Sequence, residues 1–253
     1  MADSRARAAR WLASCAALLS LSAPAGAQQL YGEVRIGMEW GNGDSSGANA
    51  VTGDPAQGDD WDTSPIGGAA LGFEIPLHEV APADWNLPEW HLRAELEWLG
   101  GRDLGFVTGS VQDLFSFVNG WALMQNFWMD FPLYQPMGAL IGRRLRVFEP
   151  MSFTVGGGIG GAWVDGKVTD NAQYGRDTTQ NFAWQVGGGP SYDLTDLVTL
   201  SLHYRYLDMG KVSPGLFIAA FQGPFSIDLT SHEVMAGVRW DFYRLPFSMR
   251  SRW

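Results

Sequence analysis

Residues 182–206 read FAWQVGGGPSYDLTDLVTLSLHYRY, and residues 233–242 read EVMAGVRWDF. In both segments apolar residues alternate with polar residues or glycine, which is the pattern of a β-strand with one oily face. A soluble β-sandwich would show the same alternation. Here, however, the apolar set carries aromatic residues near the strand ends, while the opposite set carries ionised side chains such as Arg205, Glu233 and Arg239. This combination is typical of a membrane β-barrel with lipid outside and a polar lumen inside.

Five further segments of the chain alternate in the same way. They cover residues 30–40, 68–75, 90–98, 121–131 and 153–163. With residues 182–192, 198–206 and 233–242 they make eight strands, so we predict an all-β fold, a membrane-spanning antiparallel up-and-down β-barrel with both chain ends on the periplasmic side. A barrel of ten strands is an alternative, because a further pair could lie within residues 139–148 or 216–221.

Aromatic residues should gather where the strands cross the two membrane interfaces. With the first strand running outward, one group of aromatic residues falls at the outer strand ends and another at the inner ends. The outer group is Trp40, Trp98, Trp121, Trp163, Trp184 and Tyr206, and the inner group is Trp90, Phe131, Phe153, Tyr192, Trp240 and Phe242.

The connections between the strands are of two kinds. Four long segments, rich in polar residues or glycine, are expected to be extracellular loops, and we expect the portion from Asp44 to Thr63 to be removable without loss of folding. On the opposite side, residues 194–197 predict a short turn, whereas residues 78–89 and 132–152 are long for turns on that side. The four expected loops are residues 41–65, 100–119, 164–181 and 208–229.

The N-terminus predicts export from the cytoplasm. Arginines up to Arg10 precede an apolar run at residues 11–21, and Ala25-Gly26-Ala27 is a small-residue cleavage site. The apolar run is shorter than the ~20 residues of a helical membrane span, which favours a cleaved signal peptide over an anchor. We therefore expect a signal peptide at residues 1–27, a barrel at 28–242 and a short periplasmic tail at 243–253.

Composition excludes several classes of function. Cys15, the sole cysteine, leaves with the signal peptide, so the mature chain has no thiol for catalysis, for a disulfide or for a zinc ribbon. Loss of Asp3, Arg5, Arg7 and Arg10 changes 17 basic and 27 acidic residues to 14 and 26, a net charge of −12. This charge argues against nucleic acid as a partner.

The ionised residues of the predicted inner face are a candidate site. A catalytic carboxylate pair could be among them, but the interior of an eight-stranded barrel is only wide enough for side chains to fill. Buried charges are tolerated when they are paired, so we favour an ion-pair network that plugs the lumen. Its members are Glu33, Arg35, Arg93, Glu95, Glu97, Arg205, Glu233, Arg239 and Asp241.

Other motifs are weaker. Residues 156–161 match G-x-G-x-x-G, but no helix pattern follows, so we interpret these glycines as small residues that leave room for long inner side chains. The four histidines, His78, His91, His203 and His232, suggest no metal site, and we expect no cofactor.

Several phrases of the sequence resemble a known family, the opacity-protein-like outer-membrane β-barrels, which are relatives of the OmpA transmembrane domain. The most specific are YRYL at residues 204–207 and the closing strand HEVMAGVRWDF at 232–242. The others are LMQNFWMDFPL at 123–133, FTVGGGIGGAW at 153–163 and VGGGPSYDLTDLVTLSLHYRYLDMGKV at 186–212, while the first 120 residues match only in pattern. Such barrels often stop at the aromatic residue that ends the last strand, here Phe242, whereas this chain continues to Trp253.

The resemblance implies a protein of the Gram-negative outer membrane that is not an enzyme. Its exposed loops would bind a host or surface ligand or support the envelope, and the lumen would be at most a narrow pore for small solutes. Its partners would be outer-membrane lipids and lipopolysaccharide, the barrel-assembly machinery and periplasmic chaperones.

The competing hypothesis is an outer-membrane hydrolase. Outer-membrane lipid A deacylases use a His-x-Ser arrangement, but the serine position after His203 is occupied by Arg205. An omptin-like protease could use Asp59 and Asp60 with His232, although acidic loop clusters are usually just solvated.

Overall fold

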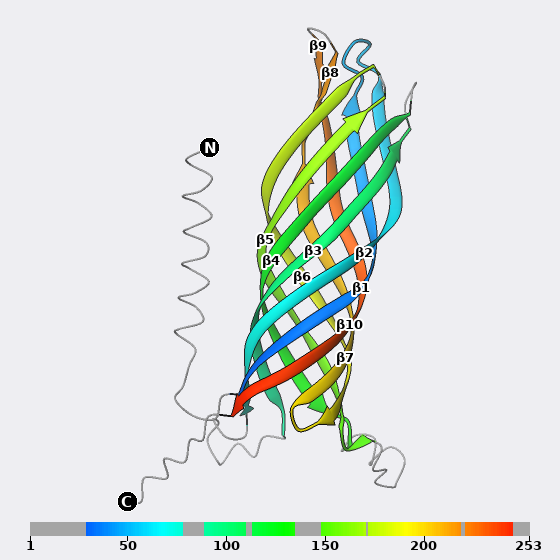
Figure 1. The fold of residues 1–253 in the computed structure, drawn as a ribbon. Helices are drawn as coiled ribbons and strands as arrows, with labels where there is room; N and C mark the ends of the chain where they lie inside the picture. Colours follow the sequence, from blue (N-terminus) through cyan, green and yellow to red (C-terminus); the bar gives the residue numbers. More distant parts are fainter. Residues whose placement is uncertain are drawn as a thin grey trace, which may run out of the picture.

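The computed structural model shows a closed antiparallel barrel (Figure 1). It describes residues 29–77, 89–109, 113–134, 148–170, 172–218 and 221–244. The barrel strands are β1 (Gln29–Ala48), β2 (Pro55–Pro76), β3 (His91–Thr108), β4 (Leu114–Pro132), β5 (Met151–Thr169), β6 (Tyr174–Thr195), β7 (Val198–Val212) and β10 (Phe225–Arg244). Each pairs with its neighbour in the chain, and β10 closes the ring by pairing with β1 and β7. The prediction of eight antiparallel strands is confirmed.

The short strands β8 (Leu216–Ile218) and β9 (Phe221–Gly223) form a hairpin in the connection from β7 to β10. This hairpin stands at the end of the barrel opposite the start of β1 and the end of β10 (Figure 1). Residues 216–221 therefore do not add strands to the barrel wall. The other segment considered for an extra pair, 139–148, lies almost entirely outside the described residues, as do the expected signal peptide and most of the C-terminal tail.

The prediction of four long loops is wrong, because the strands continue through most of those residues. Only 49–54, 109–113 and 170–173 connect strands at that end, apart from the segment that holds the β8–β9 hairpin. On the opposite end the predicted turn at 194–197 is present as residues 196–197 between β6 and β7. Residues 78–89 and 132–152 are largely outside the described part of the chain.

The outer face of the barrel changes character along β1. In β1 the outward side chains are apolar from Leu30 to Trp40 and polar beyond it, at Asn42, Asp44 and Ser46. At ~3.3 Å per residue, Leu30 to Trp40 spans roughly 33 Å of strand, which becomes roughly 25 Å of height at the usual tilt of such barrels. We call this zone the apolar belt, and the part of the barrel beyond it the outer extension. No helix in the described residues is long and apolar enough to cross a membrane.

The backbone ladder of the outer extension is interrupted on two opposite sides. Strands β2 and β3 pair only from Gly67 and Gly100 inward, apart from one bridge near the tip. Strands β6 and β7 pair only from Trp184 and Asp208 inward. In the outer extension the ladder therefore divides into two groups of strands, β7-β10-β1-β2 and β3-β4-β5-β6, and the β8–β9 hairpin continues the second group through one pairing of Tyr174 with Phe217. The chain therefore forms a closed barrel at the height of the apolar belt and two facing sheets, a β-sandwich, in the outer extension.

Polar side chains bridge both interruptions. Asp62 Oδ2 accepts the Gly105 N–H at 2.7 Å, and Asp60 Oδ2 accepts the Val107 N–H at 2.8 Å. Across the other interruption, Asn181 donates its side-chain amide to the carbonyls of Met209 and Lys211, both at 2.9 Å. These side chains stand in for the missing backbone partners of the edge strands, which would otherwise be left open to other chains.

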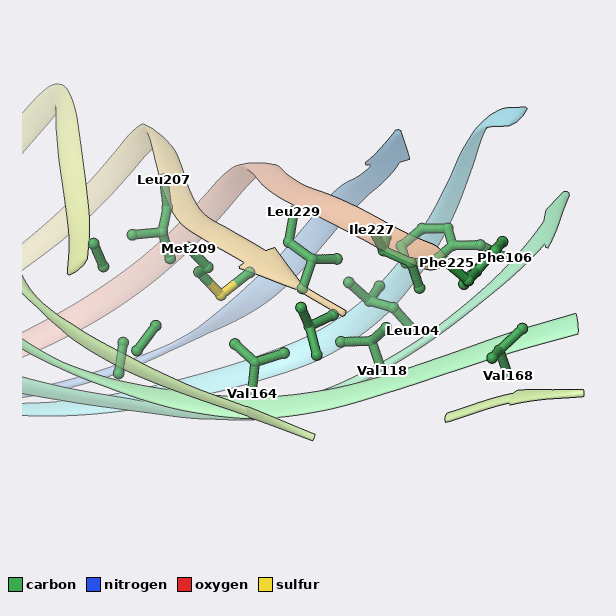
Figure 2. Packing of buried hydrophobic residues seen from close by; sticks show 14 of the residues in the cluster. Leu104, Phe106, Val118, Val164, Val168, Leu207, Met209, Phe225, Ile227 and Leu229 are labelled. Atoms are coloured by element: carbon green, nitrogen blue, oxygen red, sulfur yellow. The ribbon is translucent and has the colours of Figure 1, made fainter. Parts of the chain in front are cut away.

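An apolar core fills the space between the two sheets. Figure 2 shows Leu207, Leu229 and Ile227 from β7 and β10 directed toward Val118 and Val164 from β4 and β5. Glycines on β1 allow the close approach of β3: a Cβ on Gly43 would lie 2.7 Å from the Phe106 ring, and one on Gly41 would lie 2.4 Å from Leu104. The core members are fully or almost fully buried. Within the described residues, these side chains fill the interior at this level.

Replacing Gly43 with valine should destabilise the protein. The new side chain would overlap the Phe106 ring, and overpacking of this kind costs about 1–3 kcal/mol. The control is Gly105→Val on the outer face of β3, where a Cβ meets nothing closer than 3.7 Å. Denaturant unfolding in detergent micelles would measure both, and equal stability of the two variants would mean that the sheets do not pack as closely as described.

Replacing Asp62 with alanine should loosen the β2–β3 interruption. The Gly105 N–H would lose its acceptor, at a cost of about 1–3 kcal/mol if the group stays buried and less if water reaches it. Hydrogen exchange of the Gly105 amide should accelerate, while an Asp44→Ala variant on the exposed face of β1 should leave that exchange unchanged. Unaltered exchange in both variants would show that Asp62 does not hold the strands together.

Candidate functional site

At the height of the apolar belt, the interior of the barrel is filled with charged side chains, in contrast to the apolar core of the outer extension. Arg35, Arg93, Arg102 and Arg205 are almost fully buried there together with Glu33, Glu39, Glu95, Glu97 and Glu233. They come from β1, β3, β7 and β10, and alternation directs all of these side chains inward except Arg102, which follows a bulge in β3. Isolated charges at such depth would be strongly unfavourable, so their pairing decides whether the barrel is stable.

Arg35 is the centre of this charged layer. Its Nη1 lies 2.9 Å from Glu95 Oε1 and 2.6 Å from Glu97 Oε1, and its Nη2 lies 2.7 Å from Glu33 Oε2. Three carboxylates from β1 and β3 therefore surround one guanidinium. Tyr31 donates its hydroxyl to Glu95 Oε2 at 2.9 Å and completes the shell on the inner side.

A second set of charges lies just below the apolar core. Arg205 pairs with Glu233 and with Glu97, the latter at 3.0 Å, and so joins this set to Arg35. Arg102 pairs with Glu233 and with Glu39, the latter at 2.9 Å. The guanidinium groups of Arg102 on β3 and Arg205 on β7 thus share the carboxylate of Glu233.

Sequence reasoning missed Arg102, which fell in an expected loop. The β3–β4 register shifts between Leu99 and Arg102, and Gly101 has φ +89°, so a bulge at Gly100-Gly101 adds one residue and turns Arg102 inward. The glycine pair was the available signal, since glycine inside a strand often marks a bulge. Alternation also places Glu39 on the inner face of β1, but the predicted network did not include it.

A third set occupies the inner mouth of the barrel. Arg93 Nε lies 2.6 Å from Asp130 Oδ2, and Arg239 Nη1 lies 3.3 Å from Glu74 Oε2. His91 contacts the same Glu74 carboxylate. The sequence prediction included Arg93, Arg239 and Asp241 but omitted Glu74, Asp130 and His91. Asp241 stands near Arg239, with 3.8 Å between Oδ1 and Nε.

Neutral polar groups close the remaining space around the charges. Asn126 donates to Glu97 Oε2 at 2.8 Å, and Gln185 donates to Asn126 Oδ1 at 2.5 Å. Trp128 donates its indole N–H to Glu95 Oε1 at 2.8 Å. The small inner residues of β5, such as Gly158, leave room for Asn126, whose Oδ1 would lie 1.9 Å from a Cβ at that position. The glycine-rich segment therefore serves packing.

The residues considered for hydrolysis are not brought together. His203 is buried in the lumen and stacks on Trp128 at 5.6 Å. His232 lies on the outer face, hydrogen-bonded to the Tyr204 hydroxyl at 2.6 Å, while Asp60 is engaged by the backbone of β3. No group of three or more potential metal ligands occurs within the described residues.

The aromatic residues expected at the outer interface lie on the outer face at the end of the belt. Trp121 and Trp163 are stacked with 3.9 Å between ring centroids, and Trp184 lies 5.4 Å from Tyr206. At the inner end, Trp90 and Phe131 meet edge to face at 5.2 Å. Exposed side chains at these levels are Trp40, Trp98, Trp121, Phe153, Trp184, Tyr192, Trp240 and Phe242.

Exposed carboxylates gather on one side of the outer extension. Asp44, Asp54, Asp59 and Asp103 are exposed on the β1–β3 side, and within the described residues none of them forms an ion pair with a cation. The cations nearby are engaged on other strands: Arg176 pairs with Asp165 at 2.7 Å, and Lys211 pairs with Asp228 at 2.9 Å. This leaves one acidic face, formed by β1, β2 and β3.

Comparison with known proteins gives one family match. The family described as outer membrane protein beta-barrel domain matches residues 13–242. No curated protein sequence matches the chain.

Similar solved structures include three bacterial outer-surface barrels. Neisserial surface protein A shares 13% identity over 84% of this chain and 97% of its own, with a TM-score of 0.37. Ail, the attachment invasion locus protein of Yersinia pestis, shares 12% over 84% and 98%, with a TM-score of 0.37. OprG from Pseudomonas aeruginosa shares 12% over 84% and 96%, with a TM-score of 0.46. Likeness at this level carries no argument about what the chain binds.

Proposed function

Because this chain belongs to the outer membrane protein β-barrel domain family, we propose that it is a non-enzymatic surface protein whose outer extension binds a partner outside the cell. The family resemblance of the sequence is confirmed, and the protein is a β-barrel of the bacterial outer membrane. Cleavage after Ala27 stays a prediction, which intact-mass analysis of the mature protein would test.

The filled interior is the observation that carries this proposal. Ionised side chains occupy the barrel within the belt, and apolar side chains occupy the outer extension. A solute would have to break the Arg35 and Arg205 ion pairs and then separate two packed sheets. We infer that the ion-pair network and the apolar core together act as a plug, which leaves the outer surface as the working part of the molecule.

The charge of the outer surface indicates the kind of partner. The acidic face of β1, β2 and β3 would attract a cationic protein or peptide, with binding that weakens as salt increases. Because the outer extension is a packed sandwich, it would present this face with little loss of conformational entropy on binding. An envelope role without a soluble partner is the second candidate from the sequence, but no particular contact favours it.

The test combines conductance with binding. The refolded protein in planar bilayers should show no stable conductance steps. Its binding to immobilised polylysine should fall at least about tenfold between 50 and 500 mM salt, and should also fall in an Asp44→Asn/Asp59→Asn variant. A Lys211→Gln variant, which removes a cation from β7 of the same sheet, should bind no more weakly than the wild type.

Three results would contradict the proposal. A large stable conductance would make the protein a porin. Loss of lipid A acyl chains that disappears in a His203→Ala variant would make it a hydrolase. Equal polylysine binding by the Asp44→Asn/Asp59→Asn variant and the wild type would remove the acidic face as a binding surface.

A further inference from the structure

A groove lies on the outer face of the barrel, at the upper limit of the apolar belt. It has a volume of about 780 Å³ and is lined by residues of β3, β4, β5 and β6. Three indoles, those of Trp98, Trp121 and Trp163, form its walls, and Asn119, Asp165 and Thr178 contribute polar groups. Neither the ion-pair network nor the acidic face accounts for it.

Glycine residues and the β3 bulge form the floor of the groove. At Gly100-Gly101 the strand departs from regular pairing with β4, and neither residue has a side chain to fill the outer face. A Cβ on Gly100 would lie 2.6 Å from the Trp98 ring, so this indole lies against the glycine. On β4, a Cβ on Gly120 would lie 2.9 Å from the Trp163 carbonyl. The hollow is therefore built into the backbone.

The walls of the groove are flat, exposed aromatic surfaces. Trp121 and Trp163 stack with 6° between their planes, which holds both rings in one orientation. Trp98 is 48% exposed and Trp121 is 39% exposed. The face of an indole is electron-rich, so it attracts the C–H face of a sugar ring. The sugar hydroxyls, which lie at the ring edge, would then meet the polar groups of the groove.

The polar groups are of the kinds that bind hydroxyls. The Asp165 carboxylate is held by Arg176, with Nε at 3.0 Å from Oδ1 and Nη2 at 2.7 Å from Oδ2, and it also accepts the Thr178 hydroxyl at 3.3 Å. Asn119 donates to Asp103 at 3.3 Å. Lys167 stands opposite Arg176 in the β5–β6 register and adds a second cation just beyond the groove.

The position of the groove indicates that its ligand is membrane-bound. Directly below it the outer face continues into the belt, with Leu96 below Trp98, Leu123 below Trp121, and Ile159 below Trp163. A molecule with its sugar in the groove would lay attached acyl chains along these residues. We propose that the groove binds the sugar headgroup of an outer-leaflet glycolipid, with Lys167 and Arg176 placed to meet an anionic substituent on that sugar.

The test measures glycolipid retention. The full-length mature protein would be refolded into phosphatidylcholine nanodiscs that contain a small fraction of lipid A, a phosphorylated and acylated glucosamine disaccharide, and native mass spectrometry would count retained lipids. A Trp98→Leu/Trp121→Leu variant should lose about fivefold or more in retention. Trp184→Leu, which removes an interface indole outside the groove, is the matched control and should retain lipid A as the wild type does.

A second variant separates loss of the groove from loss of folding. Thr178→Trp would fill the groove without deleting an indole, and it should lower retention while the heat-modifiable gel shift of the folded barrel is preserved. The proposal is overturned if Trp184→Leu loses as much lipid A as the double variant, or if phosphatidylglycerol displaces lipid A equally well. It is also overturned if the deacylated, soluble disaccharide binds as tightly as lipid A. The acidic face is tested separately with polylysine, so failure here leaves the proposed function untouched.

Discussion

Replacing Arg35 with leucine should lower the free energy of unfolding by about 3–5 kcal/mol, the cost of leaving buried charge without its partner. Arg35 is the shared partner of Glu33, Glu95 and Glu97, at 2.6–2.9 Å. Its loss would leave mutually repelling carboxylates in a space closed to water. The temperature at which the folded band disappears in SDS gels should fall, and denaturant unfolding in micelles should give the magnitude.

Two comparisons make the Arg35 result specific. Arg93→Leu should also be strongly destabilising, because Asp130 would lose its main partner, although Glu33 would keep Arg35. Arg239→Leu should have less effect, because that side chain reaches the partly open inner mouth. Arg176→Leu removes an exposed pair with Asp165 and should change stability by no more than about 1 kcal/mol. If Arg35→Leu and Arg176→Leu unfold alike, the interior charges are hydrated and do not form a plug.

Deleting Asp44 to Thr63 should severely damage the outer extension. The sequence pattern suggests that this segment is a dispensable loop, but Asp44–Ala48 belong to β1 and Pro55–Thr63 belong to β2. Their removal would take the buried Ala56 out of the apolar core and delete the Asp60 and Asp62 carboxylates that hold β3. Core side chains of β3 that become exposed as a result would each lose roughly 1.5–3 kcal/mol of burial. The variant should bind a hydrophobic dye such as ANS and become sensitive to protease in the outer extension.

The matched control changes only the turn. Replacing Val51 and Thr52 with other turn residues removes no core contact, because both side chains are exposed, and stability should stay within about 0.5 kcal/mol. Dye binding and proteolysis should then match the wild type. A deletion variant as resistant and as free of dye as the control would mean that the two sheets of the outer extension do not depend on each other.

The sequence by itself determined the strands within the membrane and the side that each residue faces. Alternation of period two depends only on the backbone geometry of a strand, so it places Arg35, Glu95 and Arg205 inside and Trp40 and Trp98 outside with no knowledge of the neighbours. The structure places these side chains as expected. The lipid outside enforces this pattern, because a polar side chain there would have no partner.

The partners of the charges could not be predicted from the pattern. Arg35 meets Glu97 and Arg205 meets the same carboxylate because β1, β3 and β7 face one another across a narrow lumen, and which levels meet depends on the stagger of the closed barrel. The inward direction of Arg102 could be predicted only with knowledge of the bulge, since a single added residue reverses the alternation that follows it.

Only the tertiary structure decided that the residues of the outer extension form strands around a packed core. Its inward positions include Gly41 and Gly43, because Leu104 and Phe106 of the opposite sheet occupy the space that side chains would fill, and Asp60 and Asp62 lie at a sheet edge where they replace backbone acceptors. Glycine and aspartate at strand positions resemble a loop when only neighbours in the chain are considered. Contact between two sheets distant in sequence makes those same residues part of a packed sandwich.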